Sequence, residues 1–211
     1  MRKFILAFLF LLMLVPMPAR AESRFLVFGD SITAEGANTN SDWGYRLHIA
    51  RPDLGGFCRN GVIGRYVHQG LADIDAVMFY CSGFGTVPVT DVFILLGAND
   101  AKLIPQPTPE ATATQLRQIA AKVVAFGATP HILTLTPIIT PFFWPPNSNS
   151  WGGQVSAWLY MLNGIGPSYD VVAVRDKFTA INWLSCATDG VHPNKSLCKQ
   201  TIADAVKDTV P

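Results

Sequence analysis

Short, continuous apolar runs alternate along the chain with longer segments whose apolar residues recur at helical spacing. Each run is bounded by turn-forming residues, as the buried strands of a parallel sheet usually are. The predicted strands cover residues 24–28, 57–59, 91–96, 131–136 and 169–174. The predicted helices cover residues 43–51, 66–78, 110–126, 154–163, 177–184 and 196–207. Strands that alternate with helices predict an α/β fold with a parallel sheet covered on both faces.

Two stretches interrupt this pattern. Residues 31–42 are polar and rich in turn formers, and residues 137–153 lose all periodicity and contain four prolines. The second stretch also carries the aromatic residues Phe142, Phe143, Trp144 and Trp151. A loop of this length inside a compact domain is usually functional or mobile. Its rings are expected to form a hydrophobic lid, the wall of an acyl pocket or a platform for sugar rings, or else to fill a gap between helices.

The first 21 residues have the pattern of a secretory signal. Basic Arg2 and Lys3 precede an apolar run over residues 4–15, and Ala19-Arg20-Ala21 provides a cleavage site between small residues. The run is shorter than the roughly 20 residues of a membrane-spanning helix, so we expect cleavage after Ala21 and no stable membrane insertion afterwards. Residues 22–211 are then expected to form a single domain in the periplasm or outside the cell.

Charge and cysteine content narrow the class of protein further. The 16 basic residues nearly balance the 15 acidic ones and form no cluster, so nucleic-acid binding is not expected. An even set of four cysteines in an exported chain favours disulfides, and near neighbours pair most easily: Cys58 with Cys81, and Cys186 with Cys198. A zinc site built from Cys186, His192 and Cys198 is the alternative, but it lacks the usual short Cys-x-x-Cys spacing.

Reactive side chains follow the predicted strands. In open parallel sheets ligands bind beyond the carboxyl ends of the strands, and Ser31 stands at the first of these ends. A serine hydroxyl becomes a nucleophile when a base accepts its proton, and His192 is the candidate base. Asp189, three residues earlier, is placed to hold the other ring nitrogen of His192. Ser31 on its own could instead cap the helical turn that follows it.

Attack on an acyl carbonyl also needs donors for the developing oxyanion. The candidate donors are the backbone N–H of Ser31, a glycine N–H after the second strand, and the side-chain amide of Asn99 after the third. Gly64 lies deeper in its loop than Gly61 and is preferred, with Gly61 kept as the alternative. Asn99 and the neighbouring Asp100 could instead form only a turn.

Four motifs in order resemble the SGNH hydrolases, also called GDSL esterases and lipases. They are Gly29-Asp30-Ser31, Asn60 to Gly64, Gly97-Ala98-Asn99-Asp100 and Asp189-x-x-His192. The resemblance implies a three-layer α/β/α sandwich with a flavodoxin-like parallel sheet of about five strands. It also implies that Ser31, Gly64, Asn99 and His192 are the name-giving residues and that Asp189 completes the triad. Two departures are Ile32 in place of leucine and the short interval between Asn60 and Gly64.

The expected function is therefore an exported serine esterase that hydrolyses acyl or acetyl esters through an acyl-Ser31 intermediate. Its substrate would be a small-molecule or carbohydrate ester, and no metal or cofactor is expected. An alternative is a carbohydrate O-acetyltransferase or acetylesterase of the cell envelope, because the triad does not distinguish water from an alcohol as acceptor. A third, a catalytically silent binding module on the same fold, is disfavoured by the intact set of motifs. The sequence does not indicate an oligomeric state.

Overall fold

The computed structural model describes residues 22–35, 41–139, 145–163, 165, 168–178 and 180–210. A five-stranded parallel sheet with the order β2-β1-β3-β4-β5 forms its centre. The strands are β1 (Arg24–Gly29), β2 (Gly56–Gly61), β3 (Val89–Leu95), β4 (Thr129–Leu133) and β5 (Asp170–Val172). This order is flavodoxin-like, and it confirms the fold class expected from the sequence.

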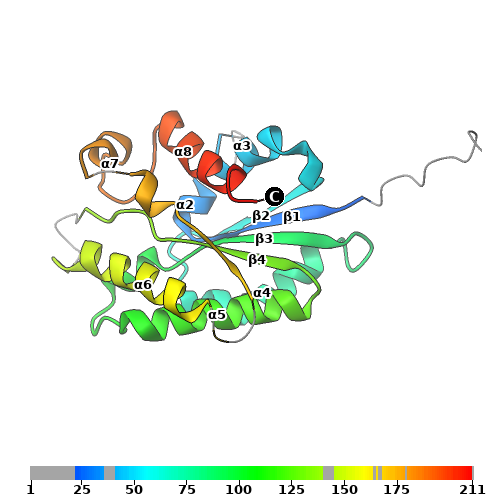
Figure 1. The fold of residues 1–211 in the computed structure, drawn as a ribbon, viewed down its shortest axis with the longest axis horizontal. Helices are drawn as coiled ribbons and strands as arrows, with labels where there is room; N and C mark the ends of the chain where they lie inside the picture. The colour runs from blue at the N-terminus through cyan, green and yellow to red at the C-terminus, as the bar shows by residue number, and fades with distance from the viewer. Residues whose placement is uncertain are drawn as a thin grey trace, which may run out of the picture.

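Helices cover both faces of the sheet, as Figure 1 shows. The helices are α2 (Ser31–Ala34), α3 (Trp43–Ala50), α4 (Val67–Cys81), α5 (Pro109–Ala125), α6 (Ser148–Leu162), α7 (Ala180–Cys186) and α8 (Ser196–Lys207). Short 3₁₀ turns lie at Pro52–Leu54, Ala98–Lys102 and Arg175–Lys177. In Figure 1, α4, α5 and α6 lie on one side of the sheet, and α3, α7 and α8 lie on the other. The molecule therefore has three layers.

Helix α5 illustrates how local sequence specifies these elements. Thr108 caps its start by accepting a hydrogen bond from the N–H of Ala111 (3.1 Å), and Pro109 occupies the first helical position. Leu116, Ile119 and Val123 recur at helical spacing and are fully buried. Full burial of each such side chain contributes roughly 1.5–3 kcal/mol, so this apolar stripe holds the helix against the sheet.

The strand order places the switch point of the topology between β1 and β3. After β1 the chain forms β2 on one side of β1, and it then crosses over to form β3 on the other side of β1. The segments that leave the carboxyl ends of β1 and β3 therefore diverge, which opens a crevice at this edge of the sheet. Ser31 follows β1 and Asn99 follows β3. The two residues are thus placed on either side of the switch point.

Two segments differ from the pattern-based expectation. Residues 31–34 form the helical turn α2 where only turns were expected, and α6 begins at Ser148, six residues earlier than predicted. Gly152 and Gly153 are poor helix formers, but Trp151 and Val155 bury one face of the helix around them. The Arg175 guanidinium lies against both glycines. Tertiary contacts therefore override the weak local preference.

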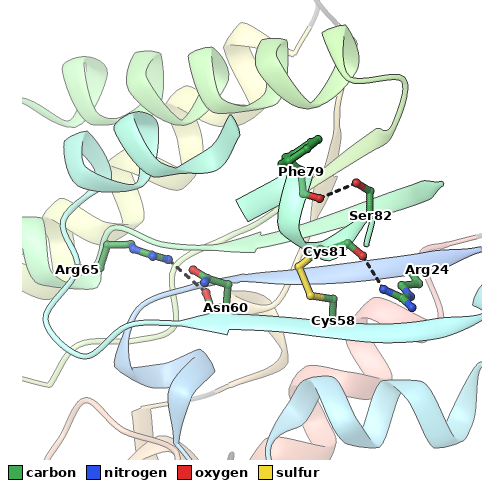
Figure 2. The surroundings of a disulfide bond; sticks show 7 residues. All are labelled: Arg24, Cys58, Asn60, Arg65, Phe79, Cys81 and Ser82. Carbon is green, nitrogen blue, oxygen red and sulfur yellow. Dashed lines mark hydrogen bonds between the residues drawn. A yellow bond between two sulfur atoms is a disulfide. The ribbon is translucent and has the colours of Figure 1, made fainter. Parts of the chain in front are cut away.

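Both favoured disulfide pairings are confirmed: Cys58 is bonded to Cys81, and Cys186 is bonded to Cys198. Figure 2 shows the first bond, which joins β2 to the end of α4. Beside it the Arg24 guanidinium donates to the backbone carbonyl of Cys81 at 3.0 Å. Because both pairs are oxidised, Cys186 and Cys198 have no thiolates for the alternative zinc site. Within the described ranges, no group of three or more histidine, cysteine, aspartate or glutamate side chains is arranged so that it could hold a metal ion.

None of the helices in the described ranges combines the length and the apolar character needed to cross a membrane. The predicted signal, residues 1–21, lies outside the described residues, and its cleavage stays a prediction. The same holds for Phe142, Phe143 and Trp144. Trp151 is described: it is buried in α6, and its indole N–H donates to the carbonyl of Pro107 at 2.8 Å. This ring belongs to the protein core.

Candidate active site

Ser31 is the first residue of α2, immediately after β1. Asp30 caps the turn by accepting a hydrogen bond from the N–H of Ile32 at 3.0 Å, so the cap is the aspartate and not Ser31. A Cβ added to Gly29 would lie 2.3 Å from the carbonyl oxygen of Leu95, so only glycine fits where β1 turns into α2. This close packing fixes the direction in which the chain continues from β1 into α2. The Ser31 hydroxyl then faces the crevice.

A chain of hydrogen bonds joins Ser31 to two residues that lie far away in the sequence. Ser31 Oγ lies 2.8 Å from His192 Nε2, and His192 Nδ1 lies 2.5 Å from Asp189 Oδ2. The structure therefore brings together all three residues that the sequence singled out for nucleophile, base and orienting carboxylate. With Nδ1 protonated toward Asp189, Nε2 is the acceptor that faces the Ser31 hydroxyl.

Backbone contacts hold Asp189 in this position. Its Oδ1 accepts hydrogen bonds from the N–H groups of Val191 (3.0 Å) and His192 (2.8 Å). Partial burial opposes ionisation of Asp189, but the hydrogen bonds from the backbone and ring of His192 and from Val191 outweigh it. They hold the pKa of Asp189 below its ordinary value. Asp189 is thus an anion at neutral pH.

The loop between α7 and α8 carries Asp189 and His192 and is attached to the core at Gly190. The Gly190 carbonyl accepts hydrogen bonds from the Trp183 indole N–H and the Ile139 backbone N–H, both at 3.0 Å. Gly190 has a φ of +79°, and a Cβ there would lie 1.9 Å from the carbonyl oxygen of Ile139. Glycine is therefore required at this position by both backbone conformation and space.

A cavity of about 470 Å³ opens over Ser31 and His192. Its walls come from α2, from Ile63 in the loop after β2, and from the loop between α7 and α8. The lining residues are Ser31, Ala34, Glu35, Ile63, Thr188, Asp189, His192 and Asn194. The volume is within the usual range of small-molecule sites.

The candidate oxyanion donors lie on the neighbouring loops. Asn99 is buried, and its Nδ2 donates to the carbonyl of Arg65 at 3.2 Å, which attaches Asn99 to the segment that follows Gly64. Gly64 has a φ of +77° and open space around its Cβ position. It lines a hollow beside the Ser31 cavity, and Ile63 borders both. A Cβ on Gly61, in contrast, would lie 2.3 Å from the Ala34 nitrogen, so Gly61 packs beneath α2.

Arg65 is a buried residue near the site that sequence reasoning missed. Its guanidinium donates to the carbonyls of Gly29 (3.1 Å) and Asn60 (3.2 Å), at the carboxyl ends of β1 and β2. Figure 2 shows the contact with Asn60. The guanidinium also lies 4.6 Å from the centre of the Phe28 ring. Arg65 thus ties together the strand ends from which the Ser31 turn and the Gly64 loop begin.

Two buried carboxyl groups lie beside this arrangement. Burial raises the pKa of Asp30 to about 7 and that of Asp100 to about 6, because the charged forms lose their hydration. One oxygen of Asp30 has no hydrogen-bond partner, whereas Asp100 accepts a hydrogen bond from the N–H of Val67 at 3.0 Å. Asp100 therefore anchors the start of α4 to the turn after β3.

The remaining histidines, His48, His68 and His131, do not line this cavity. His131 is buried in the sheet, stacked on Phe93, with Asp91 and Asp170 each 3.0 Å from one ring nitrogen. His48 stacks on Phe57. His68 is exposed and stacks on Tyr66.

The family follows from a comparison with known proteins. Residues 27–196 match the model of the GDSL-like lipase/acylhydrolase family. The chain belongs to this family. It is accordingly an ester hydrolase, and the resemblance drawn from the four sequence motifs is confirmed. The family match covers both the Ser31 turn and the loop that carries Asp189 and His192.

Solved structures of other proteins share the fold at low sequence identity. Est24, a carbohydrate acetylesterase from Sinorhizobium meliloti, is 17% identical with a TM-score of 0.71, over 89% of this chain and 97% of that one. A GDSL-like lipase from Bacteroides thetaiotaomicron is 15% identical with a TM-score of 0.70, over 96% and 94% of the two chains. At these identities the comparison establishes the fold alone. No curated protein matches the sequence.

Proposed function

We propose that residues 22–211 form one exported esterase domain that hydrolyses carboxylic esters through an acyl-Ser31 intermediate. The observation that carries the proposal is the hydrogen-bonded chain Ser31–His192–Asp189 at the wall of an open cavity. Two disulfides support export, since such bonds persist mainly in oxidising compartments. The cavity walls come from elements of this one chain, so a single copy of the protein supplies the proposed triad.

In the first half of the reaction, Ser31 Oγ attacks the carbonyl carbon of the ester and His192 Nε2 takes the serine proton. Asp189 stabilises the imidazolium that forms. The carbonyl oxygen becomes an oxyanion, for which the N–H groups of Ser31 and Gly64 and the Asn99 amide are the proposed donors. When the intermediate collapses, the bond to the alcohol oxygen breaks, and His192 returns its proton to the departing alcohol.

In the second half, a water molecule attacks the acyl-serine. His192 Nε2 accepts a proton from the water, and the new tetrahedral intermediate collapses to the free carboxylic acid. The proton on His192 returns to Ser31 Oγ, which restores the starting state. A sugar hydroxyl in place of the water would give acyl transfer instead, and the same residues would perform every step.

The test compares Ser31→Ala with Ser185→Ala, which removes the hydroxyl of an exposed serine outside the cavity. With p-nitrophenyl acetate, Ser31→Ala should lose at least about 10³-fold in kcat, and Ser185→Ala should keep the wild-type rate. A fluorophosphonate probe should label the wild type and Ser185→Ala but not Ser31→Ala. A Ser31→Ala variant that retains full activity would refute the proposal. Product analysis with an added oligosaccharide would show whether the acyl group passes to water or to a sugar.

A further inference from the structure

The side chain of Arg65 joins the ends of two strands. Its Nη1 atom donates to the carbonyl of Gly29, the last residue of β1, at 3.1 Å and to the carbonyl of Asn60 in β2 at 3.2 Å. Figure 2 shows the guanidinium directed toward Asn60. Ser31 lies two residues after Gly29, and Gly64 lies four residues after Asn60. One nitrogen atom therefore fixes the start of the Ser31 turn relative to the start of the Gly64 loop.

The backbone of Arg65 contacts the third segment that carries a proposed oxyanion donor. Its carbonyl accepts a hydrogen bond from Asn99 Nδ2 at 3.2 Å, and Asn99 is buried. An amide nitrogen carries two hydrogens, so one is bonded to Arg65 and the second remains for a ligand. Through its side chain or its backbone, Arg65 thus contacts each of the three segments that supply the proposed donors.

The loop that carries Gly64 has little packing of its own. Val62 and Ile63 are exposed, and the Cβ position of Gly64 has no neighbour within 4 Å. The pairing of β1 with β2 ends at Gly29. Beyond it, the N–H of Val62 donates to the Gly29 carbonyl at 3.1 Å, and the N–H of Arg65 donates to the Val62 carbonyl at 3.2 Å. Arg65 is buried, so it anchors the far end of this loop.

Stability alone is a weak reason for an arginine here. Burial disfavours the charged guanidinium and lowers the pKa of Arg65, although Asp73 opposes this shift. The Asp73 side chain is half exposed and lies 3.3 Å from the guanidinium. No described residue gives the buried Nε atom of Arg65 a hydrogen-bond partner. A buried charge with such incomplete partners is weak evidence for stability. A guanidinium is, however, suited to hold several carbonyls at fixed positions, because its donors form a rigid plane.

We propose that Arg65 positions the three oxyanion donors, so that all of them point to one oxygen atom in the transition state. This inference rests on the proposed function, because it concerns the donors proposed there. Arg65 is not among the residues that line the Ser31 cavity. It is therefore a positioning residue that exchanges no proton and does not touch the ester. Displacing a donor by about 1 Å can cost on the order of 10²-fold in rate.

The first test replaces Arg65 and measures kcat and KM separately on p-nitrophenyl acetate. Arg65→Met keeps an apolar stem and removes every guanidinium donor. It should lower kcat by about 10- to 100-fold and change KM by less than about threefold, because the oxyanion forms only in the transition state. Arg65→Lys keeps a charged donor that can reach one carbonyl, so its kcat should lie between those of Arg65→Met and the wild type. Arg65→Lys decides the question if Arg65→Met does not fold.

Two control variants separate positioning from stability. Asp73→Asn weakens the ion pair of the same guanidinium and leaves its two carbonyl contacts in place. Arg24→Met removes another guanidinium that donates to a backbone carbonyl, that of Cys81 at 3.0 Å. Figure 2 shows Arg24 and Arg65 at opposite ends of the strands. Both controls should keep the wild-type kcat at a temperature where circular dichroism shows every variant folded.

A double-mutant cycle tests whether Arg65 acts through the donors. Added to Asn99→Ala, Arg65→Met should lower kcat by less than about threefold, because one donor that Arg65 holds is already absent. A trifluoromethyl ketone gives an independent measurement. Ser31 Oγ adds to its carbonyl carbon, the serine proton passes to His192, and the ketone oxygen becomes an oxyanion. The inhibition constant of 1,1,1-trifluoro-4-phenylbutan-2-one should rise in Arg65→Met by the factor by which kcat falls, and it should stay unchanged in Arg24→Met.

Four outcomes would overturn the inference. They are an unchanged kcat in both Arg65 variants, an equal loss of kcat in Arg24→Met, a change confined to KM, and the same loss from Arg65→Met with and without Asn99→Ala. Each of them leaves activity dependent on Ser31. Failure of the proposed function would appear separately, as full activity in Ser31→Ala. An unchanged kcat in Asn99→Ala would remove Asn99 from the oxyanion site and would overturn the inference with it.

Discussion

The Cys186–Cys198 disulfide closes the loop that carries Asp189 and His192, so removing it should affect catalysis more than stability alone explains. Cys58–Cys81 provides a matched control within the same chain, because it joins β2 to α4 away from that loop. We compare two double variants, Cys186→Ala with Cys198→Ala, and Cys58→Ala with Cys81→Ala. Alanine avoids placing a hydroxyl group at these mostly buried positions.

The expected losses of stability are similar. In the chain-entropy treatment, a disulfide that spans 12 residues stabilises the fold by about 3 kcal/mol, and one that spans 23 residues by about 3.5 kcal/mol. The two double variants should therefore unfold at nearly the same urea concentration, well below that of the wild type. This near equality is what makes the comparison informative, since any difference in activity cannot be assigned to global stability.

Activity should separate the two variants. Without Cys186–Cys198 the loop is still held by the two hydrogen bonds to the Gly190 carbonyl, so it loosens rather than detaches. A displacement of His192 by about 1 Å can cost on the order of 10²-fold in rate. We expect kcat to fall 10- to 100-fold in this variant and by less than about twofold in the variant without Cys58–Cys81.

The assay measures kcat on p-nitrophenyl acetate at a temperature where circular dichroism shows both variants folded, together with urea unfolding of each. Equal retention of activity would show that Gly190 alone positions the loop. Equal loss of activity would show that any destabilisation of this fold impairs the site. Either result would refute the reasoning.

Three further predictions concern the surroundings of Ser31. Because the pKa of Asp30 is raised from 3.8 to about 7, its folded form binds the extra proton, and the free energy of unfolding should decline as pH rises through that window. The decline in the free energy of unfolding that Asp30 causes is on the order of 4 kcal/mol. Urea unfolding at several pH values should show this decline in the wild type and not in Asp30→Asn. The same pH dependence of the free energy of unfolding in both proteins would contradict the prediction. Gly190→Ala should lower kcat by on the order of 10²-fold. Gly127→Ala is the control, because the φ of Gly127 is also positive but its Cβ would meet no neighbour. This variant should lose stability and keep its kcat. Equal kcat values in the two glycine variants would contradict the prediction for Gly190. Asn99→Ala should lower kcat about 10²- to 10³-fold with little change in KM; a change confined to KM would remove Asn99 from the oxyanion site.

Much of the fold could be predicted because the local sequence pattern agrees with the packing environment of each element. Residues 25–28 of β1 are apolar on both faces, as a central parallel strand requires, and the bounds of α8 match the prediction completely. Helix α6 shows the opposite case. Its second turn contains two glycines, and it forms because Trp151 is buried and because Arg175 lies across the glycines. Arg175 is remote in sequence, so no local pattern indicates this contact.

The residues of the candidate site also include some that could be predicted from the sequence and some that could not. Ser31, Asp189 and His192 could be predicted because their chemistry requires particular residue types, and strand ends indicate where such residues meet. Arg65 could not be predicted from residue type, because arginine is common on protein surfaces. Its significance comes from burial and orientation, since its guanidinium lies between two strand ends. This placement depends on elements that the chain brings together only when folded.

The same reasoning distinguishes the two glycines left open by the sequence. Gly61 needs to be glycine for packing, because a side chain there would collide with the backbone of α2. Gly64 meets no neighbour, and its positive φ turns the chain beside the cavity toward the segment that Asn99 contacts. A glycine that packing already explains needs no catalytic reason. Positive φ alone does not indicate a donor either, because Gly127 also has a positive φ and an open Cβ position. Gly64 differs from Gly127 in its place, since it lines the hollow beside the Ser31 cavity. The contrast supports Gly64 as the proposed oxyanion donor.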